Sequence, residues 1–362
     1  MAKAACIQAI VTLKQAPDDK QVSFRIENLD SLLPQNNSQE TFIANTQQVL
    51  SDYFLLNVDA DALFETWNAA DNNFLARTAG LKGIRLLRQD PVETLFAFIC
   101  SANNNIARIT GMVENLKKRY GRNLGRIESA NDSDEFFEAR IQDFYSFPSV
   151  EDLYCENDSV ERTLRELGFG YRAGYIAKTA RLLHEKEGGG ENWLLALRFT
   201  PYNSAKESLL ELMGVGPKVA DCILLMALDK YDAVPVDTHV WRIATRDYGV
   251  TNGGKTLSAK TYKIVGDRFR EIFGQYAGWA QSCLFSAEIS VGGGGEVRPK
   301  KRKMIKLDSI DVKEKEFGED EENSVLDGME EKSKIVGKVK REDLVVEGKR
   351  TRKTRTVFGM GD

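Results

Sequence analysis

The residue best suited to chemistry in this sequence is a lysine at the start of a predicted helix. Lys218 follows Met213-Gly-Val-Gly-Pro217, and apolar residues recur at helical spacing on both sides of that stretch. The pattern predicts a helix, a tight turn and a second helix that begins at Pro217, where a missing N–H costs nothing. The positive end of the second helix dipole disfavours an ammonium group, so Lys218 costs stability unless it serves as a nucleophilic amine.

A fixed carboxylate follows on the next predicted helix. Asp237 stands after Pro235-Val236 and before an apolar-periodic segment, which predicts an N-cap and a helix over residues 238–248. A capping carboxylate accepts backbone N–H bonds and stays ionised. A tight turn and an ordinary cap would each explain one of these features, but the amine and the carboxylate together are far more specific.

The turn between the first two helices also predicts a contact with phosphate. Gly214 and Gly216 let the backbone come close to whatever lies above the turn. The free N–H groups and the helix dipole then form a site for a phosphate oxygen. Such a site binds nucleic acid without regard to its sequence.

Two pairs of side chains are candidates for holding a flat base. Gln281 and Phe285 are four residues apart and share a helix face, as do Lys218 and Cys222. An amide that donates and accepts suits the Watson–Crick edge of a purine, and a ring and a thiol could enclose it. The alternative is that Phe285, Cys222 and Met226 are ordinary core residues, since these types are commonly buried.

Two polar turns are candidates for contact with bases. The asparagines 103–105 interrupt a predicted helix, and Tyr171-Arg172 follows a glycine-rich turn that should expose both side chains. The asparagines are either a solvated helix break or a surface that contacts bases. The exposed pair is either plain surface or a wedge beside a guanidinium that recognises a base edge.

We predict a mainly α-helical fold with a partial N-terminal antiparallel sheet. The predicted elements are a β-hairpin within residues 7–33, helices over 38–54 and 61–79 capped by Ser38 and Asp61, a helix from Pro91 capped by Asp90, a helix from about Ile106 and a last helix over 276–289. The predicted domains are a sheet-plus-helix portion (1–82), a helix-hairpin-helix domain (83–290) and a charged, disordered tail (291–362). Within the tail, Pro299-Lys-Lys-Arg-Lys303 has the composition of a nuclear import signal.

Composition excludes several classes of protein. Five scattered cysteines and two histidines argue against a disulfide framework, an iron–sulfur cluster or a zinc site. No apolar run is long enough to span a bilayer, and the first residues lack a secretory signal. The formal net charge of −4 requires that any positive potential for nucleic acid be local.

The sequence from Leu212 to Asp221, followed by Val234-Pro-Val-Asp-Thr-His239, resembles the helix-hairpin-helix DNA glycosylases, and among them the eukaryotic 8-oxoguanine DNA glycosylases. The resemblance runs from about Gly83 to Ile289. It implies a bifunctional glycosylase and AP lyase, without a cofactor, that removes 8-oxoguanine opposite cytosine from duplex DNA. The Lys218 amine would attack C1′ and form a Schiff base, while Asp237 stabilises charge on the sugar.

The same resemblance implies roles for residues outside this pair. Asn103 would fill the space of the flipped base and Tyr171 would wedge into the stack, while Arg108 and Arg172 would contact the partner cytosine. It also places Met226 with Cys222, Gln281 and Phe285 in the base pocket, and His239 on a phosphate. The hairpin carbonyls near Leu210, Leu212 and Val215 are the candidates for holding a structural cation.

The main departure from the family pattern lies at the N-terminus. Nothing before Ile7 matches the family's glycine motif that lies against the damaged base, so we expect a truncated sheet. An inactive truncated form and a non-catalytic helix-hairpin-helix DNA-binding protein are therefore alternatives. A glycosylase for another lesion is disfavoured by Gln281 and Phe285 and by the missing C-terminal cysteine cluster. We expect a monomer in the nucleus, with a mitochondrial pool as an alternative, and no membrane contact.

Overall fold

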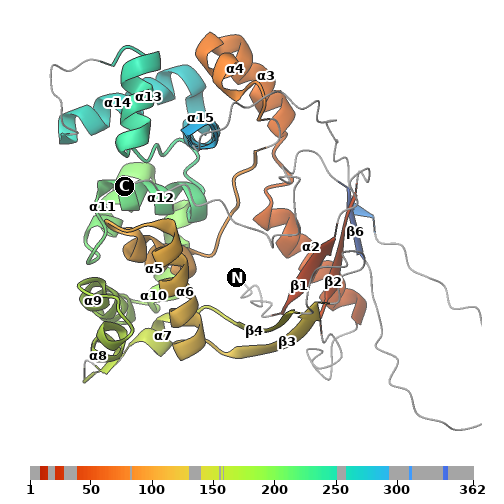
Figure 1. Cartoon of the computed structure of the whole chain (residues 1–362), viewed down its shortest axis with the longest axis vertical. Helices are drawn as coiled ribbons and strands as arrows, with labels where there is room; N and C mark the ends of the chain where they lie inside the picture. Colours follow the sequence, from red (N-terminus) through yellow and green to blue (C-terminus); the bar gives the residue numbers. More distant parts are fainter. Residues whose placement is uncertain are drawn as a thin grey trace, which may run out of the picture.

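The computed structural model describes residues 9–14, 21–27, 39–81, 84–129, 140–154, 156–157, 159–250, 258–292, 310–311 and 337–340. A body of helices lies beside a small antiparallel sheet (Figure 1). The mainly helical fold that the sequence predicts is confirmed. Within the described residues, no helix is both long and apolar enough to cross a membrane.

The helical body contains α5 (Pro91–Ser101), α6 (Ile106–Tyr120), α7 (Val150–Leu153), α8 (Ser159–Glu166), α9 (Arg172–His184), α10 (Gly190–Ala196), α11 (Tyr202–Leu210), α12 (Pro217–Ala227), α13 (Thr238–Asp247), α14 (Ala259–Phe273) and α15 (Ala277–Gly292). Short 3-10 turns, η1 (Leu197–Phe199) and η2 (Gly274–Tyr276), precede α11 and α15. Helix α12 is the central element, because it packs against both α5 and α11 and buries most of its side chains.

The N-terminal sheet begins with the predicted β-hairpin. Strand β1 (Val11–Lys14) pairs antiparallel with β2 (Gln21–Ile26), and Val11 lies opposite Ile26. Alternate β2 side chains and Ile43 of α2 (Gln39–Tyr53) form a small separate core. The hairpin therefore gains its stability from a helix laid against one face.

Two short strands from the tail extend this sheet. Strand β6 (Gly337–Lys340) pairs with β2, and β5 (Ile310–Asp311) pairs with β6, giving the order β1-β2-β6-β5. The sequence predicted no regular structure in the tail. Pairing with an open sheet edge supplies backbone hydrogen bonds that the tail's composition does not signal.

The predicted helix over 61–79 is wrong in detail, because the chain forms two helices there. Helix α3 (Ala60–Ala70) is capped by Asp59 rather than Asp61, and Asp71 has an extended backbone that caps α4 (Asn72–Thr78). The Asp71 carboxylate accepts hydrogen bonds from the N–H groups of two α4 residues, which stabilises the break. The predicted cap Ser38 lies outside the described residues.

Helices α3 and α4 share the core of the helical body. The Phe74 ring lies 5.5 Å from that of Trp67 and 5.5 Å from that of Phe273 on α14. The core of the helical body therefore includes residues from α3 and α4, while the N-terminal sheet and α2 form a separate small core.

A β-hairpin that the sequence pattern did not predict lies inside the predicted helix-hairpin-helix domain. Strand β3 (Asn123–Ser129) pairs antiparallel with β4 (Arg140–Tyr145) after α6. Arg126 and Asp143 form an ion pair across the hairpin at 2.8 Å. Polar residues dominate both strands, so the apolar alternation that marks a half-buried strand is weak.

Candidate active site

The turn before α12 is held in place by helix α9. Gly214 has a φ of +84°, and a Cβ there would lie 2.8 Å from a ring carbon of Tyr175. The Thr179 hydroxyl donates a 2.8 Å hydrogen bond to the Met213 carbonyl. By contrast, a Cβ on Gly216 would have no heavy atom within 4 Å. The hairpin thus packs against Tyr175 at Gly214, while the space next to Gly216 holds no protein atoms.

Lys218 stands in the first turn of α12, as predicted. Its side chain is half-buried, and its Nζ lies 5.8 Å from the centre of the Phe98 ring on α5. Within the described part of the chain, this amine forms no ion pair and no hydrogen bond. The amine thus lies beside an aromatic ring and has no carboxylate partner among the described residues.

Asp237 is the N-cap of α13, which confirms the prediction from the sequence. Its carboxylate accepts a 2.8 Å hydrogen bond from the Val240 N–H. The buried stretch Ala233–Val236 leads into this cap and fixes the start of α13. Asp237 is therefore held by its backbone environment while its carboxylate remains partly exposed.

The Cys222 thiol lies in the electric field of both predicted catalytic residues. Burial raises the pKa of Cys222 to about 12, the Lys218 charge opposes this rise, and the charges of Asp221 and Asp237 add to it. The thiol therefore stays protonated and apolar at neutral pH. Lys218 and Asp237 are therefore both close enough to Cys222 for their charges to affect its pKa.

The predicted base-pocket residues lie in the core around α12. Cys222, Gln281 and Phe285 are 3%, 5% and 8% exposed, and Met226 packs at the edge of the same core. Gln281 forms no hydrogen bond among the described residues, and its amide atoms are not among the fully buried atoms that lack a partner. The amide is therefore accessible enough to hydrogen-bond to a ligand.

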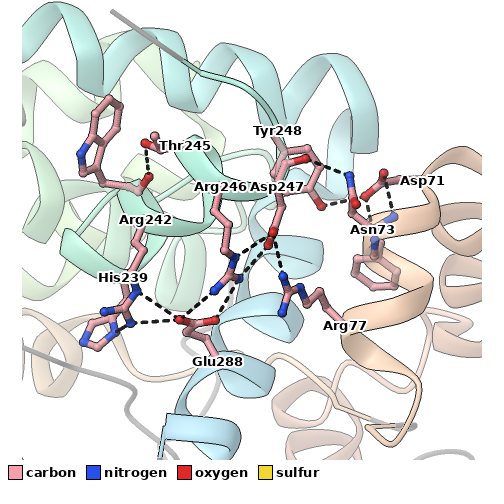
Figure 2. A network of polar contacts seen from close by, with 12 residues as sticks. Asp71, Asn73, Arg77, His239, Arg242, Thr245, Arg246, Asp247, Tyr248 and Glu288 are labelled. Atoms are coloured by element: carbon pink, nitrogen blue, oxygen red, sulfur yellow. Dashed lines mark hydrogen bonds and ion pairs between the residues drawn. The ribbon is translucent and has the colours of Figure 1, made fainter. Parts of the chain in front are cut away.

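His239 is oriented by a network of charges on α13 and α15. Its Nδ1 lies 3.0 Å from Arg242 Nη2, and its ring meets the edge of Phe285 at 5.8 Å. Arg242 in turn pairs with Glu288 at 3.0 Å, as Figure 2 shows. Burial favours protonation of Glu288, but hydrogen bonds and charge from Arg246 and Arg242 hold its pKa below its usual range.

The same network joins α13 to α4. Asp247 pairs with Arg246 at 2.7 Å and with Arg77 at 2.9 Å (Figure 2). The sequence pattern did not predict these contacts. Arg242 follows His239 by three residues, which was the available signal, but the partners on α4 and α15 are distant in the sequence.

The two predicted base-contact turns lie side by side. The Tyr171 hydroxyl donates to the Ala102 carbonyl at 3.0 Å, and Arg108 Nη2 donates to the Gly168 carbonyl at 3.0 Å. Asn103, Arg108 and Tyr171 are all exposed, and Asn103 has a φ of +47°. The structure therefore brings these three side chains onto one surface.

Arg172 differs from the exposed residue that the sequence predicts. It is only 2% exposed, and its guanidinium donates to the carbonyls of Ala102 and Asn103 while lying 4.5 Å from the Tyr171 ring centre. The Ala102 and Asn103 carbonyls accept hydrogen bonds from the Arg172 guanidinium, and these bonds compensate for its burial. Its contact with cytosine stays a prediction.

Two family models together match most of this chain. Residues 3–95 match the N-terminal domain of 8-oxoguanine DNA glycosylase, and residues 96–268 match the HhH-GPD superfamily of base excision DNA repair proteins. The N-glycosylase/DNA lyase OGG1 of Arabidopsis thaliana is 39% identical over 280 residues, which cover 77% of this chain and 69% of the relative. The chain belongs to the N-glycosylase/DNA lyase family.

Other members of the glycosylase family support this placement. The N-glycosylase/DNA lyase of Saccharomyces cerevisiae is 38% identical over 284 residues, 71% of each chain. The 8-oxoguanine glycosylase/lyase of Clostridium acetobutylicum in its apo form superposes with a TM-score of 0.59 at 31% identity, covering 77% of this chain and 82% of that one. Its complex with DNA gives 0.56 at 28% identity, covering 78% and 85%.

Family membership defines the activity of this chain at a coarse level. It is a DNA glycosylase with AP lyase activity that binds duplex DNA in base excision repair. This excludes the non-catalytic DNA-binding alternative.

Proposed function

We propose that this glycosylase excises 8-oxoguanine paired with cytosine through a Schiff base on Lys218. The observation that carries the proposal is the Lys218 amine, which is half-buried and unpaired among the described residues at the N-terminus of α12. Lys206 on the neighbouring α11, by contrast, is paired with the Asp221 carboxylate at 2.7 Å. An amine free of such a partner is suited to nucleophilic attack.

Duplex DNA would be held by its backbone at the hairpin. The open space over Gly216 lets a phosphate approach the first N–H groups of α12, and the oriented His239 ring adds a second phosphate contact. Both contacts ignore base sequence. They suit an enzyme that must scan DNA despite a net charge of −4.

The lesion must leave the stack because its C1′ is out of reach inside the duplex. Tyr171 and Asn103 stand on the exposed surface where a wedge and a gap-filling side chain are needed, and Arg108 is placed beside them for the cytosine. The burial of Arg172 means that it would reach cytosine only after releasing the Ala102 and Asn103 carbonyls.

The base would then be recognised by the core residues around α12. The unpartnered Gln281 amide would meet the Watson–Crick edge of the purine, between Cys222 and Phe285, with Met226 at the margin. Because Phe285 is buried against His239, it must turn to admit the base. The related Clostridium acetobutylicum enzyme was crystallised with DNA containing cytosine opposite 8-oxoguanine, which supports this choice of lesion.

The chemistry follows from the amine and the carboxylate. The Lys218 nitrogen forms a bond to C1′ as the bond from C1′ to the base breaks, and the base leaves with the bonding electrons and takes up a proton. The Asp237 carboxylate stabilises positive charge that develops on the sugar. Opening of the sugar gives the Schiff base, loss of a C2′ proton expels the 3′ phosphate, and water then releases the amine.

Borohydride trapping on an 8-oxoguanine:cytosine duplex tests this function, with guanine:cytosine and abasic duplexes as controls. We expect a covalent adduct on the lesion and abasic duplexes, and Lys218→Gln should reduce it by about 1,000-fold or more. Lys263→Gln is the matched control, since that lysine is 77% exposed and pairs with Asp267 on α14. Adduct formation on the abasic duplex alone would mean that the lesion assignment is wrong.

We also propose that the enzyme acts as a monomer in the nucleus, with an import receptor binding residues 299–303. The proline followed by four basic residues supports this, although the segment lies outside the described residues.

A further inference from the structure

A buried carboxylate on α12 lies at the centre of a polar cluster that the proposed chemistry does not use. Asp221 is 1% exposed. Its Oδ1 accepts a 2.7 Å hydrogen bond from the Tyr202 hydroxyl, and its Oδ2 accepts from Lys206 Nζ at 2.7 Å and from the Tyr262 hydroxyl at 2.6 Å. Helices α11, α12 and α14 are thereby tied to one carboxylate.

The Tyr262 hydroxyl also touches the two backbone segments that carry the proposed catalytic residues. It accepts a 3.3 Å hydrogen bond from the N–H of Val236, the residue before Asp237. The same oxygen lies 3.3 Å from the carbonyl oxygen of Pro217, the residue before Lys218. One phenol oxygen on α14 therefore sits between the start of α12 and the cap of α13.

We propose that Tyr262 is a positioning residue that, held by Asp221, fixes the separation between the Lys218 amine and the Asp237 carboxylate. The inference rests on the proposed roles of those two residues. Attack on C1′ requires both groups to meet one sugar, and a misplacement of about 1 Å can reduce a rate by about 100-fold. The phenol accepts a hydrogen bond from the segment before Asp237 and lies against the segment before Lys218, which restricts that freedom.

The polarity of the cluster suits this role. The Lys206 ammonium balances the Asp221 charge and lies 5.2 Å from the Tyr262 ring centre. Burial, reinforced by the Asp221 charge, raises the pKa of Tyr262 above its usual range, so the hydroxyl keeps its proton. The proton goes to the carboxylate, and the oxygen remains free to accept from Val236.

Tyr202 provides a matched control inside the same cluster. Tyr202→Phe and Tyr262→Phe each remove one phenol hydrogen bond to Asp221, of 2.7 and 2.6 Å. Each leaves the ring in place to pack. The contacts described for Tyr202 are with Asp221, Lys206 and Arg270, and not with the segments before Lys218 and Asp237.

The experiment measures single-turnover strand cleavage by the full chain on a duplex with a preformed abasic site, so it needs no assumption about the excised base. Enzyme is in excess, and DNA affinity and melting temperature are measured in parallel. We expect Tyr262→Phe to lower the cleavage rate by about 10- to 100-fold while DNA affinity changes little. Tyr202→Phe should keep a rate close to that of the unmodified chain.

The rates are compared at a temperature where circular dichroism shows that both variants are folded. Equal cleavage rates for the two variants would overturn the inference and would mean that Tyr262 has only a structural role. A loss of DNA affinity that accounts for the whole effect of Tyr262→Phe would also overturn it. The proposed function is tested separately by borohydride trapping. Undiminished trapping by Lys218→Gln would refute Lys218 as the nucleophile. If trapping depends on Lys218 but Tyr202→Phe and Tyr262→Phe cleave at equal rates, only the role of Tyr262 is refuted.

Discussion

At the scale of single residues, the proposed site is distinguished by groups that lack partners. Asp229 and Asp221 are neutralised by Arg88 and Lys206, as expected for carboxylates in a folded body. Lys218 and the Gln281 amide have no polar partner among the described residues. A bound nucleotide would supply both groups with polar partners.

The two hairpin glycines should respond differently to alanine. Gly214→Ala forces a side chain into a positive φ and against Tyr175, so we expect the free energy of unfolding to fall by about 1–2 kcal/mol. Gly216→Ala has an ordinary φ of −93° and open space, so stability should change little while affinity for undamaged duplex falls. Thermal melts and DNA titrations of both variants check this, and equal destabilisation would contradict it.

The base pocket can be tested with a pair of buried thiols. Cys222→Ala should reduce the preference for 8-oxoguanine over guanine duplex by about tenfold while affinity for undamaged duplex is retained. Cys283→Ala is the control, since that thiol is also buried but belongs to no predicted pocket. If both duplexes lose affinity equally with Cys222→Ala, the residue is not part of the pocket.

At the scale of elements, the site depends on how α13 is fixed against α4 and α15. Asp247 and Glu288 each join two arginines, and Figure 2 shows the chain of contacts from His239 to Arg77. The orientation of His239 is therefore coupled to the packing of helices that lie far apart in the sequence.

This coupling predicts a loss of stability in acid. The hydrogen bond from Arg246 is the largest cause that holds the pKa of Asp247 below its usual range, and Arg77 adds to it against burial. A lowered folded-state pKa gives stability that is fully present above the unfolded value near about 4 and is lost as pH falls through the folded value. Asp247→Asn should thus destabilise by about 1–2 kcal/mol at neutral pH and by less below about pH 4.

Urea unfolding of wild type and Asp247→Asn between neutral pH and about pH 3 measures this difference. Asp143→Asn serves as the control, because its ion pair with Arg126 lies on the exposed β3–β4 hairpin and should contribute little at any pH. A difference in unfolding free energy that grows as the pH falls would contradict this prediction.

At the scale of the whole molecule, the proposed catalytic residues and the proposed nuclear import signal lie in different parts of the chain. The core of the helical body is built from residues up to Phe285, and every proposed site residue lies within it or on its surface. The tail contributes β5 and β6 to the N-terminal sheet and carries the proposed import signal.

Ending the chain after Gly292 should therefore leave the single-turnover excision rate within about twofold, because interactions between distant parts of a chain are nearly additive. Nuclear accumulation of a fluorescent fusion should be lost, as it should in a full-length chain with residues 300–303 replaced by alanine. Unchanged accumulation of the alanine variant would reject the import assignment. A large loss of excision would place the tail in the catalytic body.

The sequence by itself determined the local features of this protein. Caps at Asp90 and Asp237, the glycine at Gly214 and the start of α12 at Pro217 follow from backbone chemistry that acts within a few residues. The same local chemistry placed Lys218 at a helix N-terminus. Tertiary structure decided what surrounds each charge, namely the burial of Arg172, the His239 network, and the Asp221 cluster. Those environments join residues far apart in sequence, and only packing brings their partners within hydrogen-bonding distance.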